Sequence, residues 1–305
     1  MKKAIGIDIG GAHVKIGIVD EDGNLEEKTW IGCNGKTREE IRKESVHRIE
    51  TYQQKDKDIL GIGRGCPGSI DSQHGIVLYS NNLKRKNVPR KDFLEKTTGL
   101  KTRITNDANA AVLGEWRFGK ARGRKNVVLL TLGTGLGSGI IVNGKLREGK
   151  DGTGAEIGHR VLYKNGRLCT CGRRGCNERY VSATGLIINA KEAITKYDSP
   201  LLSSYDSITI KDIFLSKDKD RACREAVDSF VSDLKEVLIN INVVFRPEAI
   251  LLGGGLSDFA SYFLPELNQR IREDNSGFEE NHHARILIAE NKNDAGIIGA
   301  ASLWL

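Results

Sequence analysis

Short apolar runs separated by glycine-containing turns organise the first part of the chain. Positions 3–9 and 14–19 are short apolar runs, and Asp22-Gly23 after the second run is a hairpin turn signal that leads into a third strand at 25–31. Runs of this length, bounded by turn residues, are typical of β-strands. The chain is therefore predicted to open as an antiparallel β-meander.

The same pattern continues to about residue 142, now with helices between the strands. Thr37 and Glu40 form a capping box, which predicts a helix from there to about Gln54. Asn106 can cap a second helix, whose first turn would contain Asp107. Further strands are predicted at residues 59–63, up to residue 104, at 127–131 and at 140–142.

The second half of the chain is mainly helical. An apolar stripe predicts one long helix over residues 220–245, and its members are Ala226, Phe230, Leu234, Leu238 and Ile241. Ser182 can cap a helix over residues 183–197, and Thr209 with Asp212 gives another capping signal. A strand at 249–252, a helix to about Glu273 and a strand at 286–289 follow. Asp294 is predicted to cap a last helix, 295–303, that packs back against the first domain.

Two glycine-rich connections between strands suggest two related domains. Asp8, Gly10 and Gly11 follow the first strand, and Gly133, Thr134 and Gly135 follow the strand at 127–131. Glycines let backbone N–H groups approach a phosphate, and an aspartate can bind the accompanying metal. The spacing fits neither the P-loop nor the dinucleotide fingerprint. Each connection alone could be an ordinary turn. The prediction of two related domains, each with one phosphate-binding loop, therefore depends on the repetition of the pattern.

Length and charge set the outer limits of the interpretation. The chain has 305 residues, enough for two domains, and Lys and Arg exceed Asp and Glu by 47 − 40 = 7. A mild positive balance favours anionic ligands such as ATP. Nucleic acid is not expected because no aromatic residues accompany the basic runs. The apolar runs are too short to span a membrane, the N-terminus does not resemble a signal peptide, and the six cysteines favour a reducing, cytoplasmic compartment.

One histidine and three cysteines lie close together between Glu156 and Glu178. They are His159, Cys169, Cys171 and Cys176. Three thiolates and an imidazole complete the tetrahedral set of a structural zinc ion, without an open position for a reacting water. Disulfides or independently buried thiols explain the glycine-flanked cluster less well. The zinc would hold the two flanking carboxylates in place, an arrangement that suits the hydroxyls of a sugar.

Together these motifs resemble the ROK family of repressors and sugar kinases, and most of all its bacterial glucokinases. The segments that carry the resemblance cover nearly the whole chain: residues 8–11, 106–109, 132–135, 154–159, 169–178 and 252–255. The resemblance implies an α/β protein of the two-domain sugar kinase, actin and Hsp70 type, with a ribonuclease H-like fold and an interdomain cleft. The expected domains are 1–118 plus 293–305, and 119–292.

The resemblance also implies a role for each site residue. Asp107, which by itself could be an ordinary helix N-terminal carboxylate, matches the base that takes a proton from the 6-hydroxyl of glucose during transfer from ATP. The sugar-binding positions would be Asn82, Asn106, Asp107, Glu156, His159 and Glu178. The nucleotide site would comprise Asp8, Gly10, Gly11, Lys15, Gly133, Thr134, Gly135, Gly253, Gly254 and Gly255, with magnesium bound to ATP. A structural zinc and a homodimer are also implied.

Two departures and several alternatives stay open. Ala12 replaces a threonine that is usual after the first Gly-Gly, and Asn177 stands where an apolar or aromatic residue is frequent. The preferred sugar could be N-acetylglucosamine, N-acetylmannosamine, fructose or allose, and polyphosphate could replace ATP. A sugar-sensing repressor would need a helix-turn-helix domain ahead of Asp8, and the sequence leaves no room for one there.

Overall fold

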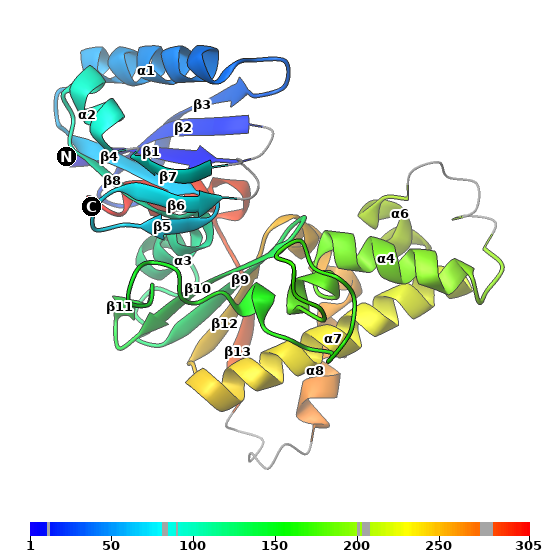
Figure 1. Cartoon of the computed structure of the whole chain (residues 1–305). Helices are drawn as coiled ribbons and strands as arrows, with labels where there is room; N and C mark the ends of the chain where they lie inside the picture. Colours follow the sequence, from blue (N-terminus) through cyan, green and yellow to red (C-terminus); the bar gives the residue numbers. More distant parts are fainter. Residues whose placement is uncertain (11–12, 81–84, 90, 200–201, 203–207, 275–282) are drawn as a thin grey trace. The chain divides into compact units, whose positions relative to one another are not determined.

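A computed structural model describes the whole chain except residues 11–12, 81–84, 90, 200–201, 203–207 and 275–282 (Figure 1). Contacts divide it into two compact units. The first comprises Met1–Lys125, Gly139–Ala155 and Glu290–Leu305, and the second comprises Asn126–Ser138 and Glu156–Ala289. The domain boundaries expected from the sequence remain a prediction. Gly11, Ala12 and Asn82 lie outside the described residues.

The first unit is built on a five-stranded sheet of order β3-β2-β1-β4-β8. Strands β1, β2 and β3 pair antiparallel, whereas β4 and β8 continue the sheet in parallel with β1. The predicted meander is therefore confirmed. The bounds are β1 Lys3–Ile9, β2 His13–Asp20, β3 Leu25–Gly32, β4 Ile59–Cys66 and β8 Thr102–Asn106.

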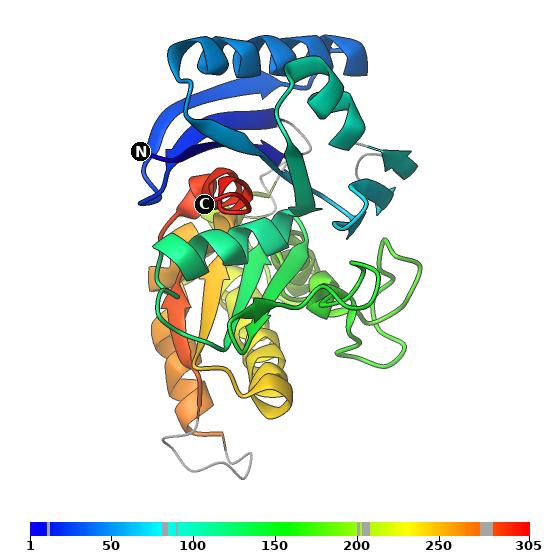
Figure 2. The same ribbon diagram turned by 90° about the vertical axis from the view of Figure 1, so that its left-hand side faces the viewer.

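Helices cover both faces of this sheet (Figure 2). Helix α1 (Arg38–Lys55) packs against β2 and β3, and α9 (Ala295–Ala301) packs against β1, β2 and β4 on the other face, beside α3 (Asp107–Phe118). Helix α9 comes so close that a Cβ at Gly63 would overlap the carbonyl oxygen of Ala300. The packing of the last helix on the first unit is thus as predicted.

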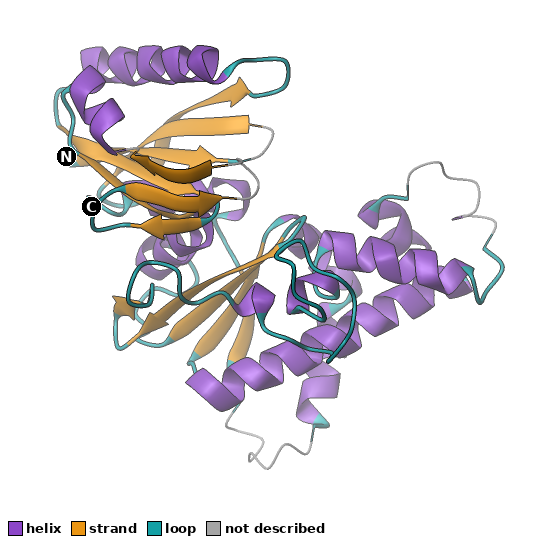
Figure 3. Cartoon of the chain, viewed as in Figure 1, coloured by secondary structure: helices purple, strands orange, loops and turns teal. Residues whose placement is uncertain are grey.

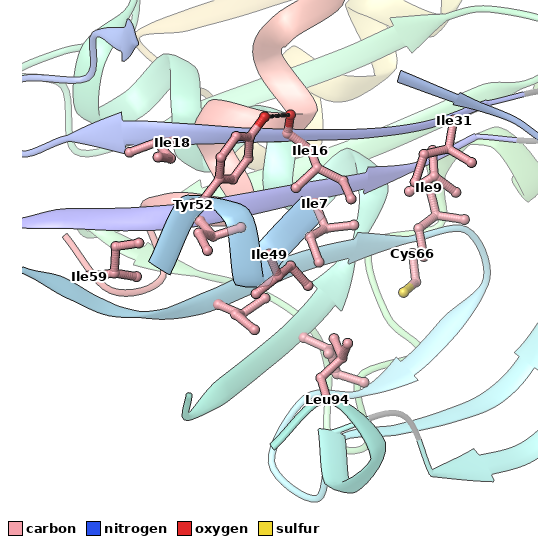
Figure 4. Close-up of a cluster of buried hydrophobic side chains, with 14 of the residues drawn as sticks. Ile7, Ile9, Ile16, Ile18, Ile31, Ile49, Tyr52, Ile59, Cys66 and Leu94 are labelled. Atoms are coloured by element: carbon pink, nitrogen blue, oxygen red, sulfur yellow. Dashed lines mark hydrogen bonds between the residues drawn. The ribbon is translucent and has the colours of Figure 1, made fainter. Parts of the chain in front are cut away.

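Isoleucines fill the space between the sheet and α1. Ile5, Ile16, Ile49 and Ile62 are fully buried in this cluster, and the Tyr52 hydroxyl closes it by donating to the Ile16 carbonyl at 3.4 Å (Figure 4). The capping box of α1 is present as predicted, since the Thr37 and Glu40 side chains bond each other's backbone N–H groups.

A second sheet repeats the strand order of the first. Its order is β11-β10-β9-β12-β13, so each sheet has a hairpin-connected edge followed by two parallel strands (Figure 3). This repetition is what the two glycine-rich connections predicted. The bounds are β9 Val127–Leu132, β10 Leu136–Val142, β11 Lys145–Leu146, β12 Ala249–Gly253 and β13 Arg285–Ile288.

The helices of the second unit pack on the long helix α7 (Arg221–Phe245). Helix α4 (Ala183–Ile194) runs beside α7, and α6 (Ile210–Ser216) and α8 (Leu264–Arg272) also contact it (Figure 1). The predicted apolar stripe of α7 is buried throughout. Among the described residues, short 3₁₀ turns of the second unit are η1 Ile157–His159, η2 Asn177–Arg179 and η3 Gly255–Tyr262, and η5 Lys292–Asp294 belongs to the first unit.

The structure differs from two of the sequence predictions, and it contains elements that had not been predicted. The helix expected up to Glu273 is divided into η3 and α8, and Pro265 lies in the first turn of α8, where its missing N–H costs nothing. Asp294 does not cap α9 with its side chain, because its carboxylate accepts from Lys28 at 2.8 Å instead. The small sheet β5 (Ser69–Asp71), β6 (Ile76–Ser80), β7 (Arg85–Pro89) and helix α2 (Lys91–Thr98) had not been predicted.

Candidate functional site

Asp107 stands in the first turn of α3, where β8 ends. The Asn106 side chain caps the helix as predicted, because its Oδ1 accepts from the N–H groups of Ala108 at 2.8 Å and Asn109 at 3.2 Å. The other end of the amide, Nδ2, donates to the Gly68 carbonyl at 2.9 Å. Asn106 is therefore held on both sides, and the start of the helix holds Asp107 at the carboxyl end of the sheet.

The electrostatic surroundings of Asp107 suit a base. Burial, and then the nearby charge of Asp8, raise the pKa of Asp107 to about 6, against an ordinary value of 3.8. A carboxylate with a pKa near the working pH accepts a proton more readily in a transition state than an ordinary aspartate does.

Asp8 lies at the end of β1, directly opposite Lys15 on β2. The Lys15 ammonium is 3.5 Å from the Asp8 carboxylate and donates to the Asn293 carbonyl at 2.7 Å. Burial raises the pKa of Asp8, and Lys15 opposes that rise. The predicted nucleotide-site residues Asp8 and Lys15 thus form a pair. Gly10 beside them closes the turn to β2 through its N–H, which donates to the His13 carbonyl at 2.9 Å.

The loop 133–135 between β9 and β10 is held by the start of α4. The Ala183 N–H donates to the Gly133 carbonyl at 2.8 Å, and the Thr184 hydroxyl donates to the Thr134 carbonyl at 2.7 Å. Ser182 caps α4 as predicted. Because α4 follows η2 directly, the loop is connected to the chain segment that carries the cysteines.

Glu178 contacts this loop directly. Its Oε2 accepts from the Leu136 N–H at 3.1 Å, and it occupies the space that a Cβ at Gly135 would need. A residue predicted to bind the sugar therefore adjoins a loop predicted to bind phosphate. Both belong to the second unit, so their contact does not depend on how the two units are arranged.

The three glycines after β12 have different surroundings. Gly254 has a φ of 81°, and a Cβ there would lie 2.7 Å from the Leu132 carbonyl oxygen. The backbone conformation and the close packing of η3 against β9 therefore explain why this position is a glycine. Gly253 is a buried residue of β12, whereas a Cβ at Gly255 would meet no atom within 4 Å. The space beside Gly255 is where a ligand could approach the backbone.

His159, Cys169, Cys171 and Cys176 come together as the sequence predicted. Their candidate ligand atoms all lie within 4.8 Å of one another. His159 Nδ1 is 3.7 Å from Cys169 Sγ, and Cys171 Sγ is 3.7 Å from Cys176 Sγ. Four atoms at about 2.0–2.3 Å from a tetrahedral zinc lie on the order of 3.5–3.8 Å apart. The residues present therefore fit a metal ion with four protein ligands.

The buried thiols give a second reason to expect a cation here. Burial and the neighbouring thiols raise the pKa of Cys176 to about 12. A thiol in such surroundings loses its proton readily only when a cation replaces it. Cys169 Sγ also lies 3.8 Å from Glu178 Oε1, so the cluster adjoins a predicted sugar-binding carboxylate.

Asn177 links the two turns that carry these residues. It is fully buried, and its Nδ2 donates to the Ile157 carbonyl at 2.8 Å, which joins η2 to η1. The Ile157 N–H in turn donates to the Ser138 hydroxyl at 3.0 Å. An apolar residue at 177 could not make this bond, so the departure noted in the sequence has a structural role. The cluster is further anchored to α7 by Tyr163, whose hydroxyl donates to Asp233 at 2.5 Å.

Not every site residue could be found from motifs. Of the predicted sugar-binding residues, Asn106 and Asp107 belong to the first unit, and Glu156, His159 and Glu178 belong to the second. Sequence reasoning missed Glu148, whose carboxylate accepts from side chains on both sides of the Asn106-Asp107 pair. No motif signals it, because it is an isolated glutamate in a loop.

Comparison with known proteins matches the ROK family over residues 4–305. A glucokinase of Thermotoga maritima is 37% identical over 99% of this chain and 96% of its own length. The chain belongs to the ROK family. Among solved structures, the ROK family glucokinase of Streptomyces griseus in complex with glucose and AMPPNP has a TM-score of 0.85 and 34% identity, with 99% of each chain covered.

Some proteins similar to this chain are named as repressors. A xylose repressor of Caldicellulosiruptor bescii is 30% identical over 98% of this chain and 77% of its own length. The glucokinases match over nearly their entire length, and these comparisons confirm both the predicted two-domain α/β fold and the class of hexose kinase. No helix of the described chain is long and apolar enough to cross a membrane.

Proposed function

We propose that this ROK family member transfers the γ-phosphoryl group of ATP to the 6-hydroxyl of glucose. The observation that carries the proposal is Asp107, held in the capped first turn of α3 with a pKa raised to about 6. Near neutral pH this carboxylate is ionised and can take the proton of the attacking hydroxyl. The glucokinase relatives support glucose as the acceptor.

The remaining predicted residues would bind the two substrates. Hydrogen bonds to the sugar are assigned to Asn82, Asn106, Asp107, Glu156, His159 and Glu178. The nucleotide is assigned to Asp8, Gly10, Gly11, Lys15, Gly133, Thr134, Gly135, Gly253, Gly254 and Gly255. Magnesium bound to ATP would neutralise phosphate charge, and the half-buried Asp8 carboxylate is suited to face it.

A zinc ion held by His159 and the three cysteines would be structural. Its role would be to stiffen the turns η1 and η2, which carry His159 and Glu178. Because Glu178 also contacts the loop 133–135, the same metal would steady part of the proposed nucleotide site.

One assay tests the proposal and its alternatives together. ADP release from magnesium-ATP is measured with glucose, mannose, N-acetylglucosamine, N-acetylmannosamine, fructose and allose, and kcat/KM is compared. We expect a clear preference for glucose, and a fall in kcat/KM of about tenfold per pH unit below about pH 6 as Asp107 is protonated. Preference for an acetylated sugar would keep the mechanism and refute the substrate.

The similarity to a xylose repressor favours a second candidate, a sugar sensor without turnover. Glucose binding measured by calorimetry, combined with no ADP release and no transfer from polyphosphate, would support the sensor and refute the kinase. Asp107→Asn separates the two further, because a kinase should lose at least about a hundredfold in kcat, whereas sugar binding should be nearly unchanged.

A further inference from the structure

Among the described hydrogen bonds, Glu148 accepts from one side chain before and one side chain after the Asn106-Asp107 pair. Its Oε1 accepts from the Thr105 hydroxyl at 3.0 Å and lies 3.5 Å from the Asn109 amide nitrogen, and its Oε2 accepts from the Ser72 hydroxyl at 3.0 Å. The carboxylate thus collects donors from β8, from α3 and from the turn after β5.

The donors on α3 and β8 are buried. Thr105 is 1% exposed and Asn109 is 4% exposed, so water is a poor alternative partner for either side chain. Thr105 immediately precedes the capping residue Asn106, and Asn109 lies two residues beyond Asp107. Glu148 therefore holds the backbone on both sides of the proposed base, although it does not itself belong to β8 or α3.

The loop that carries Glu148 is held against the same region. The Glu148 carbonyl accepts from the Gly154 N–H at 2.8 Å and closes the loop 148–154. Gly152 in this loop lies so close to β5 that a Cβ would overlap the Ile70 carbonyl oxygen. The glutamate is consequently supported by a docked loop and is not a long side chain reaching freely across the surface.

We propose that Glu148 is a positioning residue for Asp107, an inference that rests on the proposed kinase function. The carboxylate only accepts hydrogen bonds, so it fixes the Thr105 hydroxyl and the Asn109 amide as donors and locks the junction of β8 and α3. This junction sets the direction of the Asp107 side chain. A misplacement of about 1 Å in a reacting group can cost on the order of a hundredfold in rate.

Two substitutions at Glu148 test this role, with a matched control on α3, the helix that carries Asp107. Glu148→Ala should lower kcat by about tenfold to a hundredfold and leave KM for glucose and ATP within about threefold, because Glu148 is not among the residues proposed to bind either substrate. Glu148→Gln keeps one acceptor oxygen and should recover part of the loss. The control is Glu115→Gln, a fully buried carboxylate near the far end of α3 that accepts from the Asn291 N–H at 2.7 Å.

The control should keep kcat within about twofold even if it lowers the melting temperature as much as the Glu148 variants do. All kinetics are measured well below the lowest melting temperature. Unchanged kcat in Glu148→Ala, beside a large loss in Asp107→Asn, would refute this inference alone. An equal loss of kcat in Glu115→Gln would refute it too, since the effect would then be general destabilisation. No turnover by the unaltered chain would refute the proposed function and this role with it.

If Glu148→Ala fails to fold, the kinetics of Glu148→Gln test the positioning role instead. We then expect kcat to fall at least about threefold with KM unchanged within about twofold. A loss that appears in KM alone would overturn the positioning role, because it would mean that Glu148 acts on substrate binding.

Discussion

Asp107→Asn should make the protein more stable at neutral pH while it lowers kcat at least about a hundredfold. The raised pKa of Asp107 means that the folded chain holds this proton more tightly than the unfolded chain does, so ionising the group costs stability. The penalty is absent below about pH 4, grows as pH rises through about 6, and is complete above that. Asparagine removes the penalty, and its Oδ1 can still accept from the Ala108 N–H as Asp107 Oδ1 does at 3.0 Å.

The magnitude follows from the two pKa values. The difference between about 6 and the ordinary 3.8 corresponds to at most about 3 kcal/mol, since one pH unit is worth about 1.4 kcal/mol. Two effects reduce it. Asp107 is only partly buried, and the helix N-terminus favours a negative charge by about 0.3–1 kcal/mol. We therefore expect Asp107→Asn to raise the free energy of unfolding by about 1–2 kcal/mol at pH 8 and to leave it almost unchanged at pH 4.

Urea unfolding at pH 8, 6 and 4 measures this gain as a shift of the midpoint. Asp20→Asn is a control of opposite sign in the same unit. Burial alone would raise the pKa of Asp20, but hydrogen bonds from Asn24 and Asp22 outweigh it and lower the pKa. That carboxylate contributes stability above its unfolded pKa, so Asp20→Asn should lower the midpoint at pH 8, and by less as the pH falls toward 3.

A midpoint for Asp107→Asn that equals or falls below that of the unaltered chain at pH 8 would contradict the reasoning. A gain of the same size at every pH would contradict it as well. In that case the asparagine would stabilise the protein by better packing or hydrogen bonding. The carboxyl group of Asp107 would then not have the raised pKa that the proposed base requires.

Three further predictions concern the metal cluster and the packing of α9. Cys171→Ser should lower both the zinc content, measured by atomic absorption, and the glucose affinity, because the cluster supports Glu178; full zinc content in this variant would contradict the ligand set. Asn177→Ala should weaken glucose binding by about 1–2 kcal/mol in calorimetry through loss of the bond between η2 and η1, with zinc still bound. Gly63→Ala should lower stability by at least about 2 kcal/mol in urea unfolding, because its Cβ would overlap the Ala300 carbonyl; an unchanged midpoint would show that α9 can move away.

Local patterns predicted most of the elements because they act within a few residues of the chain. The Thr37 capping box, the Asn106 cap and the stripe of α7 each depend on neighbours in sequence, and each was confirmed. Prediction failed where a distant residue competed. Asp294 stands where a helix-capping residue is expected, but its carboxylate accepts a hydrogen bond from Lys28 on β3. No local sequence pattern could reveal this distant partner.

The residues of the predicted site also differ in whether local sequence patterns could identify them. The four metal ligands and the Asn106-Asp107 pair lie in short motifs, so residue type and spacing alone could identify them. Glu148 and the contact between Glu178 and the loop 133–135 depend on segments about 40 residues apart. Their meeting is set by strand order and loop docking.

By itself, the sequence determined the ROK family, the two glycine-rich connections and the residue types that the proposed chemistry needs. Only the tertiary structure decided that Asp8 lies near enough to Asp107 to help raise its pKa, that Asn177 joins η1 to η2, and that Glu148 holds the start of α3. The physical reason is that turns, caps and metal ligands are specified by short-range geometry. Burial and the pairing of distant charges exist only after the sheets have brought those residues together.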